Sequence, residues 1–97
     1  MTRSIVLTIK QLREKIDKID ADIIKKLSQR KKLALKIGKL KSKSEKSVID
    51  KKREQQLINY YKKLCVKYNL QPQFVLKIFK LIIVNSRKLQ KKDNENT

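Results

Sequence analysis

The chain has 97 residues, of which 27 are Lys or Arg and 9 are Asp or Glu, so its formal charge at pH 7 is +18. This length predicts one domain, residues 1–97, whose core at about 8–91 is so small that a partner subunit is expected to complete it. Cys65 is the single cysteine, so an intrachain disulfide is excluded. Because the chain also lacks histidine, no metal site is predicted. The cysteine content also favours a reducing, cytoplasmic location, and no apolar stretch is long enough for a membrane span.

The high positive charge could indicate binding to nucleic acid. Such a protein would gather its cations into one patch or offer aromatic side chains for base stacking. Here the lysines are spread along the whole chain, in pairs such as Lys25-Lys26 and Lys51-Lys52 on outer helix faces. Most of the aromatic residues are expected on or near inward faces. The aromatic residues are Tyr60, Tyr61, Tyr68, Phe74 and Phe79. We therefore favour a solvated surface and expect no specific binding to nucleic acid.

The first predicted helix runs from about Thr8 to about Lys43 and contains no proline. Apolar residues three or four positions apart trace one face of this helix. They are Leu12, Ile16, Ile19, Ile23, Leu27, Ala34 and Ile37. Two cations, Arg30 and Lys41, occupy the same face, and burying an unpaired cation is costly. The pattern therefore predicts a positively lined pocket for a small anion.

The length of this helix has a consequence for assembly. It would span roughly 50 Å, which is too long to bury its apolar face inside a monomer of this size. It must pair with another chain or consist of two shorter helices laid end to end. Gly38, the single glycine, falls near its end. This position indicates either close approach by a ligand or another backbone, or simple tolerance of glycine near a helix end.

The second predicted helix runs from about Val48 to Tyr68, after a polar break at 42–47. Ser47 is expected to cap this helix, which would place Asp50 at the third helical position, near the positive end of the helix dipole. The residues expected to face inward are Leu57, Tyr61, Leu64 and the small core residue Cys65.

The third predicted helix follows an exit at Asn69 and Leu70. Pro72 fits its first turn, because the missing N–H would be unpaired there anyway. The helix should end at about Lys91, before a polar tail at 92–97. The residues expected to face inward are Val75, Ile78, Phe79, Ile82 and Ile83. The fold class is therefore all-α, with one long and two shorter helices per chain.

Several polar residues lie on the faces of the second and third helices that otherwise carry apolar side chains. Asp50, Arg53 and Glu54 share one face, either as an exposed cluster balanced by lysines or as two hydroxyl acceptors beside a guanidinium for a carboxylate. Ser86 and Gln90 continue the apolar stripe of the third helix, which either fades to polar or buries a Gln that needs partners. No nucleophile–base pair accompanies them, which argues against hydrolysis and group transfer.

In this order and spacing, these residues resemble the all-helical (type II) class of chorismate mutases, including the mutase domain of the bacterial bifunctional P- and T-proteins. The matching site residues are Arg13, Arg30, Lys41, Asp50, Arg53, Glu54, Ser86 and Gln90. The strongest stretches are LREKIDKIDADIIKKLSQR (12–30), IGKLK (37–41), IDKKRE (49–54) and FKLIIVNSRKLQ (79–90). Each motif alone is weak, whereas their joint spacing over most of the chain is specific.

The resemblance implies an intertwined helical homodimer, in which each first helix crosses to the partner and two active sites are shared between chains. Helix geometry agrees, because Arg13 and Arg30 are 17 residues apart, roughly 25 Å along one helix. They cannot hold one small dianion from the same chain. The family pattern implies that Arg30 and the partner's Arg13 hold the two substrate carboxylates, with Ser86 helping at the ring carboxylate.

The implied activity is that of an isomerase, the Claisen rearrangement of chorismate to prephenate in phenylalanine and tyrosine biosynthesis. The reaction is intramolecular, so no cofactor is expected. By the family pattern, Lys41 and Gln90 donate to the ether oxygen as it gains negative charge. Asp50 and Glu54 anchor the ring hydroxyl side, and Arg53 orders that corner. The residues expected to act in catalysis are Lys41, Gln90, Arg30 and Glu54.

Two alternatives remain open. The isochorismate pyruvate lyases share the fold and have counterparts of Arg13, Arg30, Lys41 and Gln90. They are not expected to keep Asp50, Arg53 and Glu54 together with Ser86, so this cluster favours the mutase. The other alternative is a basic helical module for nucleic-acid binding or dimerisation. The resemblance is compatible with a free-standing enzyme and with part of a bifunctional enzyme, with or without feedback regulation.

Overall fold

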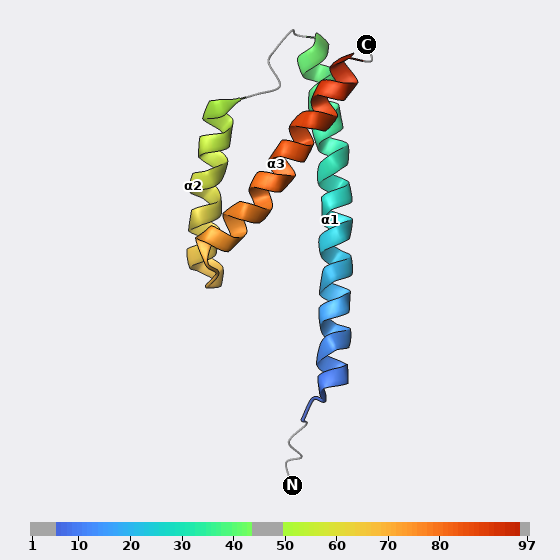
Figure 1. The fold of residues 1–97 in the computed structure, drawn as a ribbon, viewed down its shortest axis with the longest axis vertical. Coiled ribbons are helices and arrows are strands. Elements are labelled where there is room, and N and C mark those ends of the chain that lie inside the picture. The colour runs from blue at the N-terminus through green and yellow to red at the C-terminus, as the bar shows by residue number, and fades with distance from the viewer. Residues whose placement is uncertain (1–5, 44–49, 96–97) are drawn as a thin grey trace. The chain divides into compact units, whose positions relative to one another are not determined.

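The computed structural model describes residues 6–43 and 50–95, with side chains described as far as Lys91, and every element in those ranges is helical. The helices are α1 (Ile9–Lys43), α2 (Lys51–Tyr68) and α3 (Pro72–Glu95), as Figure 1 shows. They contain 35, 18 and 24 residues, so the prediction of one long and two shorter helices is confirmed. The chain divides into two compact units, Met1–Lys32 and Leu33–Thr97. The single domain and the intertwined dimer stay predictions.

The start of α1 is set by a reciprocal cap between Thr8 and Gln11. The Thr8 backbone N–H donates to Gln11 Oε1 at 2.9 Å, and the Gln11 backbone N–H donates to Thr8 Oγ1 at 3.1 Å. This capping box satisfies N–H groups that a helix start otherwise leaves unpaired. The predicted boundaries of this helix, from about Thr8 to Lys43, are confirmed to within one residue.

The predicted apolar stripe of the first unit lies in solvent in the single chain. The exposed fractions are 45% for Leu12, 55% for Ile16, 57% for Ile19, 53% for Ile23 and 41% for Leu27. A continuous row of large aliphatic side chains exposed in this way is typical of an interaction surface.

The start of α2 differs from the prediction. Asp50 is the N-cap, with an extended backbone (φ −124°, ψ 91°), and its Oδ1 accepts the backbone N–H of Arg53 at 2.9 Å. The helix therefore begins at Lys51, and the prediction that Asp50 occupies the third helical position is wrong. Aspartate and serine are comparable N-cap residues, because both side chains can accept the N–H three residues later. Here the Asp50 cap marks the start of the helix. The proposed cap Ser47 and start Val48 lie outside the described residues.

The turn between α2 and α3 agrees with the prediction. Asn69 adopts the left-handed conformation (φ 55°, ψ 50°), and the Leu70 N–H donates to the Cys65 carbonyl at 2.9 Å. This is a typical helix exit, and Pro72 opens α3 as expected. The predicted end of α3 at Lys91 is wrong, because the helix continues to Glu95. The tail after Lys91 contains no glycine or proline to stop it.

Helices α2 and α3 contact each other as a hairpin (Figure 1). This hairpin contains two of the buried apolar residues, Tyr61 and Cys65. Cys65 is 2% exposed and Tyr61 7% exposed, and the Tyr61 ring packs against Phe79 with 4.2 Å between ring centroids. The prediction that Cys65 is a core residue is confirmed. Leu57 and Leu64 are half-buried on the same face.

Other residues that were expected to face inward are exposed in the single chain. Ile78 is 41% exposed, and the aromatic residues Tyr60, Tyr68 and Phe74 are 55%, 62% and 61% exposed. The prediction that most aromatic residues lie on inward faces is therefore wrong for three of them. A chain this short has too few helices to cover both faces of a hairpin.

Within residues 6–43 and 50–95, no helix combines the length and apolar character that crossing a bilayer requires. In the same part of the chain, no three His, Cys, Asp or Glu side chains are placed to hold a metal ion. The cytoplasmic location stays a prediction.

Candidate functional site

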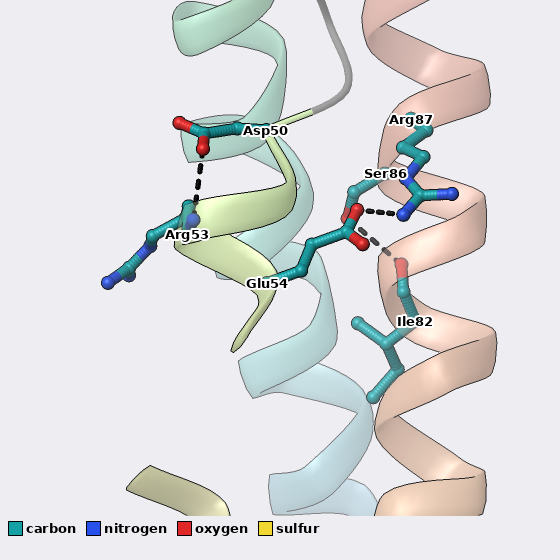
Figure 2. A network of polar contacts seen from close by, with 6 residues as sticks. All are labelled: Asp50, Arg53, Glu54, Ile82, Ser86 and Arg87. Carbon is teal, nitrogen blue, oxygen red and sulfur yellow. Dashed lines mark hydrogen bonds and ion pairs between the residues drawn. The ribbon is translucent and has the colours of Figure 1, made fainter. Parts of the chain in front are cut away.

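A cross-helix ion pair joins α2 to α3 at the open end of the hairpin (Figure 2). The Glu54 carboxylate points from the first turn of α2 toward α3, where Arg87 Nη2 donates to Glu54 Oε1. The side chains of Arg87 and Glu54 are 34% and 24% exposed. Partial burial strengthens such a charge pair relative to one in open solvent.

Arg87 is absent from the site that the sequence predicts. In that prediction Arg53 is the guanidinium beside Asp50 and Glu54, because the three residues share one face of the second helix. A signal for Arg87 was nevertheless present, since this residue lies four positions after the inward-facing Ile83 and directly follows Ser86. A cation at that spacing on an apolar face needs a buried or half-buried anion as its partner.

Asp50 and Arg53 are placed differently from Glu54. Asp50 is exposed and uses its carboxylate to cap α2. The exposed Arg53 side chain points away from α3 in Figure 2. Of these three neighbours, Glu54 is the one whose side chain reaches across to α3 in the single chain.

Ser86 lies beside Arg87 on α3 and is half-buried. Its hydroxyl donates to the backbone carbonyl of Ile82 at 3.0 Å (Figure 2). A hydroxyl has one proton to donate, so Ser86 must rotate away from Ile82 before it can donate to a ligand carboxylate.

Gln90 lies one turn beyond Ser86 and is buried, with an exposed fraction of 8%. It packs directly on Gly38, since a methyl group at Gly38 would lie 3.0 Å from Gln90 Cα and 3.2 Å from its Cβ and Cγ. Close approach of another backbone is thus the reason for a glycine here, and the alternative of simple tolerance is not needed. Lys41 follows on the same face of α1 within one turn and is half-buried.

Replacing Gly38 with alanine tests this contact. Alanine favours a helix interior by about 0.5–1 kcal/mol, but its methyl group would press on the Gln90 backbone. We expect these effects nearly to cancel in the melting temperature, while the displaced Gln90 lowers the turnover number of the activity proposed below by several-fold. Gly38→Val, which is larger, should lower both. The exposed neighbour variant Lys39→Ala is the control and should change neither. An active and equally stable Gly38→Val would show that the contact does not matter.

Arg13 and Arg30 belong to the first unit, on α1. Arg13 is exposed and Arg30 is half-buried. Because α1 is one continuous helix, the two residues are separated by roughly 25 Å along its axis, as the sequence predicts.

A cavity of about 290 Å³ lies between α2 and α3. Among the predicted site residues, Glu54 lines it, together with Arg87 at the same end. The other lining residues are Ile58, Tyr61, Leu76, Phe79, Lys80, Ile83 and Val84. The Glu54–Arg87 pair is therefore bordered by mainly apolar side chains, a setting in which a charge depends strongly on its partner.

Comparison with known proteins gives consistent matches. The chorismate mutase type II family matches residues 12–91. The chain is 32% identical over 87 residues to a chorismate mutase of Methanocaldococcus jannaschii, which covers 90% of this chain and 88% of that protein. It is 36% identical over 80 residues to a bifunctional chorismate mutase/prephenate dehydratase of Buchnera aphidicola, covering 82% of this chain and 21% of that protein. The bifunctional protein of the same description in Escherichia coli is 35% identical over 75 residues. The chain thus spans most of the first relative and about a fifth of the bifunctional ones.

Proposed function

Since the chain belongs to the chorismate mutase type II family, we propose that it catalyses the rearrangement of chorismate to prephenate. The observation that carries this proposal is the family match over residues 12–91, which includes every residue of the predicted site. The activity is that of an isomerase, and the proposal covers this reaction alone.

The reaction sets modest chemical demands on the protein. An ether C–O bond breaks while a C–C bond forms in the same molecule, so atoms and electrons balance without a nucleophile, a proton acceptor or a cofactor. The protein has to hold the folded conformer of a dianion and stabilise the negative charge that develops on the ether oxygen. Cations and neutral N–H donors suit both tasks.

We assign the ether oxygen to Lys41 and Gln90. The burial of Gln90 supports this assignment, because a donor shielded from water interacts more strongly with developing charge. The Gly38 contact supports it further, since it brings the Gln90 backbone against the face of α1 that carries Lys41. We assign Glu54 and Asp50 to the hydroxyl side of the substrate ring. We assign Arg53 to the ordering of this part of the site.

We assign the two substrate carboxylates to Arg30 and the partner's Arg13, with Ser86 beside the ring carboxylate. A homodimer is required for this arrangement, because Arg13 and Arg30 of one chain lie too far apart along α1. The exposed stripe from Leu12 to Leu27 supports the same dimer, as it offers a long apolar surface for a second copy.

The direct test is a spectrophotometric assay of chorismate consumption by the purified chain, with the product identified by mass spectrometry. We expect prephenate to form, and we expect no pyruvate from either chorismate or isochorismate. Release of pyruvate from isochorismate without prephenate formation would instead indicate a lyase of the same fold, and the mutase proposal would then be abandoned.

A further inference from the structure

The geometry points to Arg87 as a further positioning residue: we propose that its guanidinium holds the Glu54 carboxylate in the orientation that accepts a substrate hydroxyl. The inference rests on the proposed function, because it gives Arg87 a task in the same site. Arg87 would act through Glu54, and the substrate would touch the carboxylate.

The first support is the contact itself. Arg87 Nη2 donates to Glu54 Oε1 across the two helices, and both side chains are partly buried (Figure 2). Glu54 extends from an exposed helix start into a cavity with mainly apolar walls. An isolated carboxylate in such a setting would turn outward to water. A cation on the opposite helix prevents this and fixes the side-chain rotamer.

The second support is an unused donor. Arg87 Nε is buried and, among the described side chains, has no hydrogen-bond partner. Leaving such a donor unsatisfied costs about 1–3 kcal/mol. Arginine binds carboxylates most strongly through two parallel N–H groups. A small rotation of Glu54 would bring its second oxygen to Nε, and each oxygen would keep a lone pair for a ligand hydroxyl.

The third support is that the other nearby cations do not offer the same geometry. The Arg53 side chain is exposed and points away from α3 (Figure 2). Lys80 lines the cavity, but it is exposed and lies seven residues before Arg87, roughly 10 Å along α3. The contact that the structure gives Glu54 comes from Arg87.

A double-mutant cycle between Arg87 and Glu54 tests the inference. Arg87→Met keeps the apolar stem and removes the donors, and Glu54→Gln keeps an acceptor oxygen without the charge. We expect Arg87→Met to lower kcat/KM by about 10- to 100-fold in the wild-type background, and by less than about 3-fold in the Glu54→Gln background, as contacting residues are not additive. Arg87→Lys keeps the charge without the fork and should restore part of the activity.

The matched control is Lys88→Ala, which removes a cation from the exposed neighbouring position and should leave kcat/KM unchanged. Circular dichroism melting shows which variants are folded, and the cycle can be run with Arg87→Lys if Arg87→Met is too unstable. A merely structural role for Arg87 predicts losses that follow the melting temperature and multiply with those of Glu54→Gln.

The outcomes separate the two proposals. The role of Arg87 is overturned if the wild type is active and the losses in kcat/KM from Arg87→Met and Glu54→Gln multiply. It is also overturned if Arg87→Met is as active as an active wild type. Both outcomes leave the proposed function standing. A folded wild type that does not convert chorismate overturns both. Losses that fail to multiply, with partial recovery in Arg87→Lys, support the inference.

Discussion

Gln90→Ala is expected to lower the turnover number by about 10²- to 10³-fold at every pH, since loss of one donor to developing negative charge typically costs about 3–4 kcal/mol. The side chain is buried, so water cannot readily take over its role. Gln73→Ala is a matched control, because it makes the same substitution at an exposed position of the same helix, and it should remain fully active.

Gln90→Glu refines this test through pH. A glutamine donates at every ordinary pH, whereas a glutamic acid donates only while it is protonated. Above the pKa of the introduced carboxyl group, a negative charge would face an oxygen that is itself becoming negative. The variant should therefore be active on the acid side of that pKa and lose activity as pH rises through it. Nearby Lys41 would favour the charged form and burial the neutral form, so the profile itself must locate the transition.

The measurement is the turnover number of wild type, Gln90→Ala and Gln90→Glu from acid to neutral pH. Wild type should show no comparable acid-favouring transition. A Glu variant that follows wild type throughout would remove Gln90 from the role of donor, and with it the assignment of the ether oxygen to this part of α3.

The second large effect concerns Arg13 and Arg30. Each alanine variant should be nearly inactive as a homodimer, because every site then lacks one carboxylate partner. A heterodimer of an Arg13→Ala chain with an Arg30→Ala chain would contain one intact site and one doubly damaged site. Such heterodimers, purified through two different affinity tags, should recover about half of the wild-type activity per dimer.

The control for this experiment places both substitutions in one chain. A heterodimer of wild type with the Arg13→Ala/Arg30→Ala chain has one residue missing from each shared site and should be nearly inactive. If each chain instead supplied both arginines to its own site, the two results would be reversed, and the shared-site arrangement would be refuted.

The helices were predictable to the extent that local chemistry determines them. Thr8 with Gln11, Asn69 and Pro72 are boundary residues whose effect needs no distant partner, and their boundaries were confirmed. The start of α2 was misjudged because two candidate caps compete three residues apart, and spacing alone does not rank Ser47 against Asp50. The extension of α3 to Glu95 was missed because polar character was taken as a sign of a helix end.

The site was less predictable, because its contacts join residues far apart in the chain. The packing of Gly38 on Gln90 depends on where α1 meets α3, and periodicity left its cause open. The pairing of Glu54 with Arg87 required knowledge of which faces of α2 and α3 meet. The exposure of Ile78 shows the same limit, since periodicity assigns an apolar face without saying which molecule covers it.

The exposed stripe of α1 also concerns the amount of protein present. If a second copy covers Leu12, Ile16 and their neighbours, part of the free energy that keeps each chain folded comes from association. Stability then becomes a property of the solution, because the fraction of folded chains depends on protomer concentration. In a cell that makes too little of this chain, activity would fall by more than the amount of chain does, even with every residue of the site intact.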